Sequence, residues 1–211
     1  MADTAFNRYV LSLPGLWIRH EDRDWAGDVQ LFLASAADQF SEALVAFDLF
    51  KPFTAADVRR DPHGVPLAED SVDSRRRFIY AKAFVYALDA ARGFVQVVAA
   101  VSALPSATVA ACDAFLRQFG YIRDIRNSLQ HIEERIQAKG SFGKKLPGPI
   151  IDLGSLNECR FGVTTGDGRH LEVEISEDFI GRFRLALSDV LWSLDWLGPG
   201  ETLIRRCGSD A

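Results

Sequence analysis

Apolar residues recur at intervals of three and four along most of this chain of 211 residues, which is the periodicity of an amphipathic α-helix. The pattern is clearest from Phe115 to Ile136. Glycine and proline interrupt it at points that are typical of helix ends, although Gly93 lies inside one segment, which is therefore either one kinked helix or two. The helices that we expect run over 24–50, 71–104, 106–139 and 177–196.

Before the last of these segments the apolar period changes to two. Phe161 and Val163 alternate with polar neighbours, as do residues 171–175, and the turn-forming residues 165–168 lie between them. This pattern predicts a β-hairpin, inserted at about 156–176, that must pack against the helices because a lone hairpin is unstable in water. No linker separates two apolar cores, so we predict a single domain over 1–211, a mainly α bundle of four to five helices.

Composition excludes several functional classes. The longest apolar stretch is shorter than the roughly 20 residues that a bilayer requires, so no membrane contact is expected. Three widely spaced cysteines, Cys112, Cys159 and Cys207, are typical of free thiols in a reducing compartment, which favours the cytoplasm. A formal net charge of -5 provides no global positive field, so any contact with nucleic acid needs a local basic patch.

Common catalytic motifs are missing from the sequence. It contains no Gly-x-Ser-x-Gly, His-Glu-x-x-His or Gly-x-Gly-x-x-Gly, and no glutamate is followed three residues later by histidine as in di-metal bundles. The segment 140–145 is glycine- and lysine-rich but lacks the spacing of a phosphate-binding loop. Acidic clusters near His20 and His63 are typical of helix caps and loops. We therefore expect neither a metal site nor a cofactor.

One polar group stands outside the apolar seam of the third expected helix, and it consists of Arg126, Asn127 and His131. Asn127 and His131 are four residues apart, so on a continuous helix they face the same way, and Arg123 extends the stripe by one turn. A guanidinium, a carboxamide and an imidazole on a rigid helix can bind a phosphate and transfer a proton near neutral pH. These three residues are the candidate catalytic residues.

An arginine followed by a polar residue and, a few positions later, by histidine on a late helix resembles the HEPN superfamily. The resemblance rests on Arg126, Asn127 and His131 and on the helical layout, and it implies a HEPN-like helical bundle. It also implies cleavage of RNA without metal or cofactor, as in toxin–antitoxin pairs and phage defence. Carried over, His131 would be the general acid or base and Arg126 would stabilise charge on the phosphate, while Asn127 would orient one of them or contact the phosphate.

The same resemblance implies a homodimer, since the active site is commonly shared across a dimer and the chain carries one copy of the motif. RNA would be the substrate, and Arg123, Lys144 and Lys145 are the candidate basic residues at the mouth of the cleft. Two features depart from the family: Glu133 stands where some toxins carry tyrosine, and the hairpin is additional. The alternative is a non-catalytic helical interaction or assembly module that binds a protein partner, such as an antitoxin.

Overall fold

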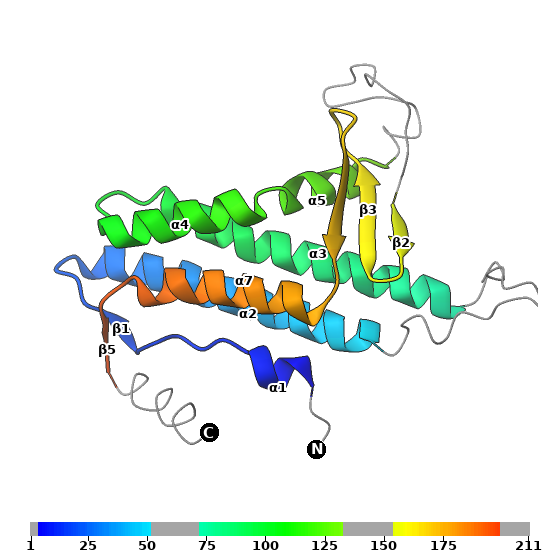
Figure 1. The fold of residues 1–211 in the computed structure, drawn as a ribbon. Coiled ribbons are helices and arrows are strands. Elements are labelled where there is room, and N and C mark those ends of the chain that lie inside the picture. Colours follow the sequence, from blue (N-terminus) through cyan, green and yellow to red (C-terminus); the bar gives the residue numbers. More distant parts are fainter. Residues whose placement is uncertain (1–3, 52–71, 133–153, 199–211) are drawn as a thin grey trace, which may run out of the picture.

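The structure is a computed structural model that describes residues 4–51, 72–132 and 154–198 (Figure 1). The remaining residues, including Lys144, Lys145, Glu133 and Cys207, lie outside the described ranges. Most of what is described is helical, which confirms the predicted fold class. In chain order the elements are α1 (Ala5–Tyr9), β1 (Trp17–Ile18), α2 (Arg23–Phe50), α3 (Val72–Ala99), α4 (Ser106–Phe119), α5 (Ile122–Gln130), β2 (Ser155–Asn157), β3 (Arg160–Thr164), β4 (His170–Glu174), α7 (Glu177–Trp192) and β5 (Trp196–Leu197).

The centre of the bundle is the pair of long helices α2 and α3, which lie side by side and run in opposite directions (Figure 1). Phe40 on α2 and Phe84 on α3 are completely buried. Helices α4 and α7 pack on this pair and on each other, and the ring centroids of Phe119 and Phe183 are 4.7 Å apart. Aromatic rings from separate helices thus fill one shared core.

The third predicted helix is two helices in the structure, which corrects the expectation of one helix over 106–139. Helix α4 ends at Phe119, Gly120 and Tyr121 form a turn, and α5 begins at Ile122. A Cβ on Gly120 would lie 2.6 Å from the carbonyl oxygen of Leu116, so the turn requires glycine. The apolar period continues through the turn because residues on both sides of it face the same core. Periodicity alone therefore did not reveal the break.

The second predicted segment is one helix rather than two. Helix α3 runs through Gly93 without interruption and ends at Ala99, five residues before the predicted end at Leu104. Although α2 and α3 contain 28 residues each, no helix in the described ranges is both long and apolar enough to cross a membrane.

The predicted hairpin is confirmed and gains a third strand. Strands β3 and β4 pair antiparallel with Phe161 opposite Val173, and β2 adds to the other edge of β3. Both of these side chains are completely buried, so this face of the sheet joins the main core. At the tip of the hairpin, Arg169 Nη2 donates to Asp124 Oδ2 at 3.2 Å and links the turn to α5. The insertion is therefore attached to the helix that carries the candidate motif.

Besides β2, three short elements were not predicted. Helix α1 packs on α2, and the two-residue strands β1 and β5 pair with Ile18 opposite Trp196. The last predicted helix accordingly ends at Trp192, and Trp196 belongs to β5. Strands of two residues carry no detectable period, so these two follow only from the way in which residues 16–19 and 195–197 meet in the folded chain.

Candidate functional site

Helix α5 carries Arg126 and Asn127 of the candidate motif on its polar face. Ile122, Ile125 and Leu129 are buried against the core. On the opposite side, Arg123 is exposed, and Arg126 and Asn127 are half-buried. Since α5 packs on α3, these three polar side chains lie along the seam between the two helices. The apolar and polar faces of one short helix thus fix both its packing and the site.

A groove of about 580 Å³ follows this seam. Helix α5 contributes Arg123, Arg126 and Asn127, which are three of the residues singled out from the sequence. We call this depression the α3–α5 groove. Its other lining residues come from α3 and are Asp89, Ala90, Arg92, Gly93, Gln96, Val97 and Ala100.

Arg92 and Asp89 are the two charged residues that are buried among those described. Arg92 Nε donates to Asp89 Oδ1 at 2.8 Å, and Arg92 Nη1 donates to Gln96 Oε1 at 2.8 Å. The Arg92 side chain is only 7% exposed, so its guanidinium is held in one position by these two acceptors. A buried ion pair of this kind fixes geometry more than it adds stability.

Helix α5 completes the same network. Arg126 Nε lies 3.5 Å from Asp89 Oδ2, and Arg126 Nη1 donates to Asn127 Oδ1 at 3.1 Å. Arg123 Nη1 lies at 3.4 Å from Gln96 Oε1. Asp89 and Gln96 therefore each hold one arginine from α3 and one from α5, and the groove is built jointly by the two helices.

The charges in the groove do not balance. Three arginines line it, and Asp89 is the single carboxylate among its lining residues. One of these arginines is buried, one is half-buried and one is exposed, and positive charges without a matching number of negative charges favour an anion from outside. Gly93 leaves room for an anion in the groove, since a Cβ at this position would meet nothing within 4 Å. The groove therefore has an excess of positive charge beside open space.

Tyr86 lies near the same network, one turn before Ala90 on α3. Burial raises the pKa of the Tyr86 hydroxyl, and the positive charge of Arg126 partly opposes this rise. The phenol is therefore protonated at neutral pH and is a hydrogen-bond donor. It adds no negative charge to the neighbourhood of the groove.

His131 is not among the residues that line the groove. Helix α5 ends at Gln130, and His131 adopts φ -111° and ψ 37°, with its backbone N–H donating to the Asn127 carbonyl at 3.2 Å. The imidazole is exposed just beyond the helix end. The sequence expectation that Asn127 and His131 share one helical face therefore needs correction, because the helical geometry stops before the histidine.

Sequence reasoning missed Asp89, Arg92 and Gln96 as parts of the site. Their signal was present: they are polar residues at spacings of three and four within an otherwise apolar stretch of α3. Asn127 also borders a smaller depression against the hairpin tip, lined in part by Thr165 and Asp167. The hairpin therefore touches the same segment of α5 from the other side.

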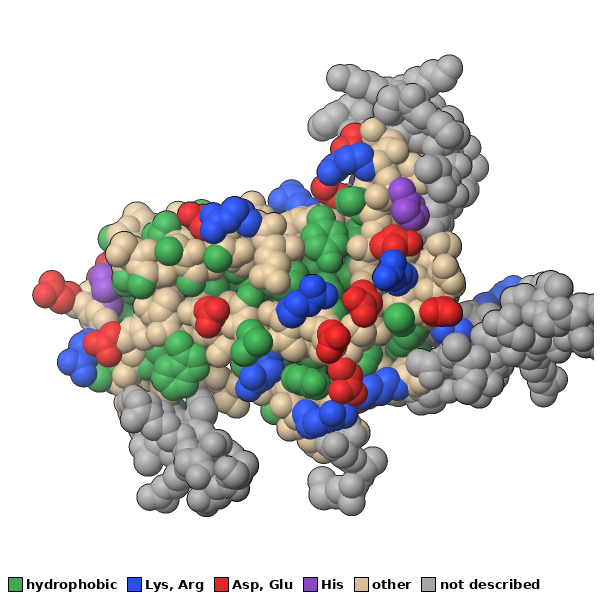
Figure 2. Space-filling view, viewed as in Figure 1, with side chains coloured by type: hydrophobic (Ala, Val, Ile, Leu, Met, Phe, Trp, Pro, Cys, Tyr) green, Lys and Arg blue, Asp and Glu red, His purple; other side chains and the backbone are tan. Residues whose placement is uncertain are grey.

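Positive charge is not gathered over the face drawn in Figure 2, where basic and acidic side chains are interspersed. Within the described ranges, no group of three or more His, Cys, Asp or Glu side chains is placed to hold a metal ion. The α3–α5 groove is thus a local concentration of arginines on a chain of net charge -5.

Comparison with models of protein families, with curated proteins and with solved structures found no match for this chain.

Proposed function

We propose that the protein is a metal-independent endoribonuclease of the HEPN type, acting as a homodimer in the cytoplasm. The observation that carries the proposal is the α3–α5 groove, in which three arginines face one carboxylate. Guanidinium groups bind phosphate oxygens through paired N–H donors, and an RNA backbone supplies a phosphate at every nucleotide. A phosphodiester is therefore the substrate group that best matches the charge of the groove.

In the proposed reaction the ribose 2′-hydroxyl attacks the neighbouring phosphorus, and the bond from phosphorus to the 5′-oxygen of the next nucleotide breaks. A base takes the 2′ proton and an acid protonates the leaving oxygen, which gives a 2′,3′-cyclic phosphate and a 5′-hydroxyl. His131 performs one of the two proton transfers. Arg126 neutralises charge on the non-bridging oxygens, and Asn127, whose Oδ1 accepts from it, orients the guanidinium.

The homodimer accounts for the position of His131 outside the groove of its own chain, because a second copy supplies a second motif. The outer face of α3 provides a surface for that copy. Its residues recur at alternating intervals of four and three, which is the spacing of two-helix packing, and none of them is buried. We call this face the α3 seam; it consists of Ile79, Ala83, Tyr86, Ala90, Gly93, Val97 and Ala100. The last four also line the α3–α5 groove, so a second copy on this face would lie beside the groove and bring its own motif to it.

The test is cleavage of a mixed RNA substrate by purified protein in the presence of a chelator. We expect Arg126→Ala and His131→Ala each to lower the rate by at least about 100-fold. The matched controls are Arg117→Ala, on the exposed face of α4, and His170→Ala, on β4, which should retain wild-type rates. Products that end in a 2′,3′-cyclic phosphate would support the reaction as written.

Equal background cleavage in all five proteins would refute the nuclease and favour the alternative, a non-catalytic interaction or assembly module. The observation that favours this alternative is the exposure of apolar side chains on the α3 seam, with Ile79 58% and Val97 44% exposed. Such a face binds a protein partner, for example an antitoxin, as readily as a second copy. Loss of cleavage in the two controls as well would show that the loss is not specific to Arg126 and His131 and would contradict their assigned roles.

A further inference from the structure

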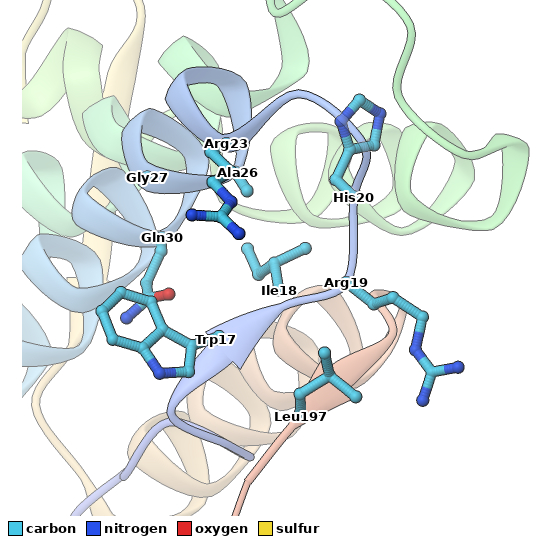
Figure 3. A pocket seen from close by; sticks show the side chains of 9 residues that line it. All are labelled: Trp17, Ile18, Arg19, His20, Arg23, Ala26, Gly27, Gln30 and Leu197. Carbon is cyan, nitrogen blue, oxygen red and sulfur yellow. The ribbon is translucent and has the colours of Figure 1, made fainter.

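A second depression lies where β1 and β5 run beside the first turns of α2 (Figure 3). It measures about 490 Å³, which is within the range of small-molecule sites. Ile18 and Ala26 are buried and form part of an apolar lining. We call this depression the Trp17 pocket, and its lining residues are Trp17, Ile18, Arg19, His20, Arg23, Ala26, Gly27, Gln30 and Leu197.

Trp17 gives the pocket an aromatic wall. Trp17 is 66% exposed, so its indole contributes little to the packing of β1 on α2. Trp25, by comparison, donates its indole N–H to the Ser102 carbonyl and stacks on His20 with ring centroids 4.0 Å apart. The indole of Trp17 is therefore available to stack against a planar ligand.

The ionisable groups of the pocket are all basic. Arg19, His20 and Arg23 line it, and no carboxylate does. Arg19 is paired with Asp195 at 3.1 Å, and His20 Nδ1 accepts from the backbone N–H of Asp22. Arg23 makes no hydrogen bond or ion pair with its guanidinium among the residues described. Figure 3 shows this side chain reaching from α2 toward Ile18, across the opening from Trp17.

Gln30 adds an acceptor of fixed orientation. Its Nε2 donates to the Leu16 carbonyl at 2.8 Å, so the amide cannot turn over, and Oε1 is left on the pocket side (Figure 3). A hydrogen-bond donor on a ligand that stacks on Trp17 can reach this oxygen. The pocket thus combines a stacking surface, a cation and an acceptor.

Gly27 is a second, independent feature of the Trp17 pocket, because a glycine at this position leaves the space beside α2 open. Glycine weakens a helix interior relative to alanine, so a glycine in mid-helix usually has a packing reason. A Cβ on Gly27 would meet nothing within 4 Å. The packing of the bundle therefore does not account for Gly27, whereas room for a ligand does.

We propose that the Trp17 pocket binds a small ligand with a planar aromatic ring and an anionic group. The ring stacks on Trp17, the anion pairs with Arg23, and a donor on the ring system bonds to Gln30 Oε1. This site shares no lining residue with the α3–α5 groove, so the proposal is independent of the proposed nuclease. A nucleoside monophosphate and an aromatic carboxylic acid both have the required chemistry.

The experiment is calorimetric titration of the full chain with adenosine 5′-monophosphate and, separately, with indole-3-acetate. Adenosine and inorganic phosphate serve as half-ligands. We expect one of the two aromatic anions to bind at least ten-fold more tightly than either half-ligand. The aromatic anion that binds identifies the source of the ligand, a nucleotide or an aromatic acid. If neither anion binds with a dissociation constant below about 1 mM, which is on the order of the weakest specific binding, the proposal is overturned.

Variants locate the binding. Arg23→Ala and Trp17→Ala should each weaken it at least ten-fold, whereas Arg117→Ala and Trp192→Ala, which alter exposed side chains of the same types elsewhere, should not. Gly27→Leu should block binding while the protein keeps its thermal midpoint, which separates occlusion from misfolding. Unchanged affinity in Arg23→Ala, Trp17→Ala and Gly27→Leu would show that the ligand binds elsewhere and would overturn the proposal.

Discussion

The carboxylate of Asp89 holds two helices together through two different arginines. One oxygen accepts from Arg92 of the same helix, and the other lies 3.5 Å from Arg126 of α5. Removal of the carboxylate would leave Arg92 buried without its counter-charge, which costs more than the ion pair contributes when it is intact. The energetic role of the pair is therefore tested best by removing its members singly and together.

We expect Asp89→Leu to lower the free energy of unfolding by about 3–5 kcal/mol, because it strands a buried guanidinium. The double variant Asp89→Leu with Arg92→Met should recover most of this loss, since two apolar side chains of similar volume replace the pair. Urea denaturation measures both values. A double variant as unstable as the single one would show that the cost does not arise from the unpaired charge.

The thiol of Cys112 should be unreactive in the folded protein. Burial raises its pKa to about 11, with the nearby charge of Asp113 adding to the effect. At pH 8 only about one molecule in a thousand then carries the thiolate, the form that reacts with alkylating agents. Iodoacetamide labelling followed by peptide mapping should show Cys159, which is half-buried, modified well before Cys112.

Labelling in urea provides the control for this prediction, because unfolding should remove the difference between the two thiols. In the folded protein the Cys112 rate should rise as the pH approaches 11. Labelling of Cys112 as fast as that of Cys159 at pH 8 would contradict its burial.

At the level of the helices, two glycines have opposite roles. Gly93 lies in the middle of α3 with open space beside it, whereas Gly120 forms the turn between α4 and α5. Gly93→Ala should raise the free energy of unfolding by about 0.5–1 kcal/mol, since alanine favours the helix interior. Gly120→Ala should lower it, because a Cβ there would lie 2.6 Å from the Leu116 carbonyl oxygen. Paired urea titrations compare the two, and effects of the same sign would contradict this assignment.

Glu177 joins three helices at their ends. It begins α7 and accepts from Lys51 at the end of α2 at 2.6 Å and from Arg8 of α1 at 3.1 Å. The hydrogen bond from Lys51 holds the pKa of this carboxyl below its usual range, and the charges of Lys51 and Arg8 add to the shift. Because the folded pKa is the lower one, ionised Glu177 favours folding, and this contribution disappears as the pH falls through the folded value.

Glu177→Gln should therefore destabilise the protein at pH 7 by about 0.5 kcal/mol, a small value because the pair is accessible to solvent. The difference from wild type should be full above about pH 4.3 and should shrink at lower pH. Asp178→Asn is the matched control, since it removes a charge from the same first turn of α7 without an ion pair in the described structure. Thermal melts from about pH 3 to about pH 7, a range that includes the usual pKa of a glutamate carboxyl, measure the effect.

At the level of the whole molecule, the proposed homodimer depends on the α3 seam. Val97→Glu places a charge on the seam and should convert the proposed dimer to a monomer. Leu185→Glu, on α7, is the matched control because Leu185 is 61% exposed and lies outside the seam. Analytical ultracentrifugation distinguishes the two results. A wild-type protein that is monomeric at all concentrations would refute the dimer directly.

Much of the fold was predictable because burial imposes a period on the sequence. The span of α2 was predicted to within one residue, and the hairpin was placed correctly by its period of two. Residues Asp22 and Ser176 cap α2 and α7 through their side chains, as local chemistry favours. The break at Gly120 was missed because the apolar period runs straight across it.

The candidate site was predictable only in part. Arg126 and Asn127 were found from the sequence because they stand outside an apolar seam, but Asp89, Arg92 and Gln96 lie 30 or more residues earlier on another helix. Which helix packs against α5, and in which register, depends on long-range contacts that no local pattern records. The place of His131 depended on where α5 ends, and the sequence pattern continued past that point.

The sequence by itself determined that this chain forms a helical bundle with a β insertion, because the alternation of apolar and polar residues dictates which faces are buried. Only the tertiary structure decided that α3 and α5 share one network of arginines, that His131 stands outside it, and that β1 and β5 form a pocket around Trp17. The physical reason is that the period of a segment fixes the face that it buries, whereas a site arises where faces from distant segments meet.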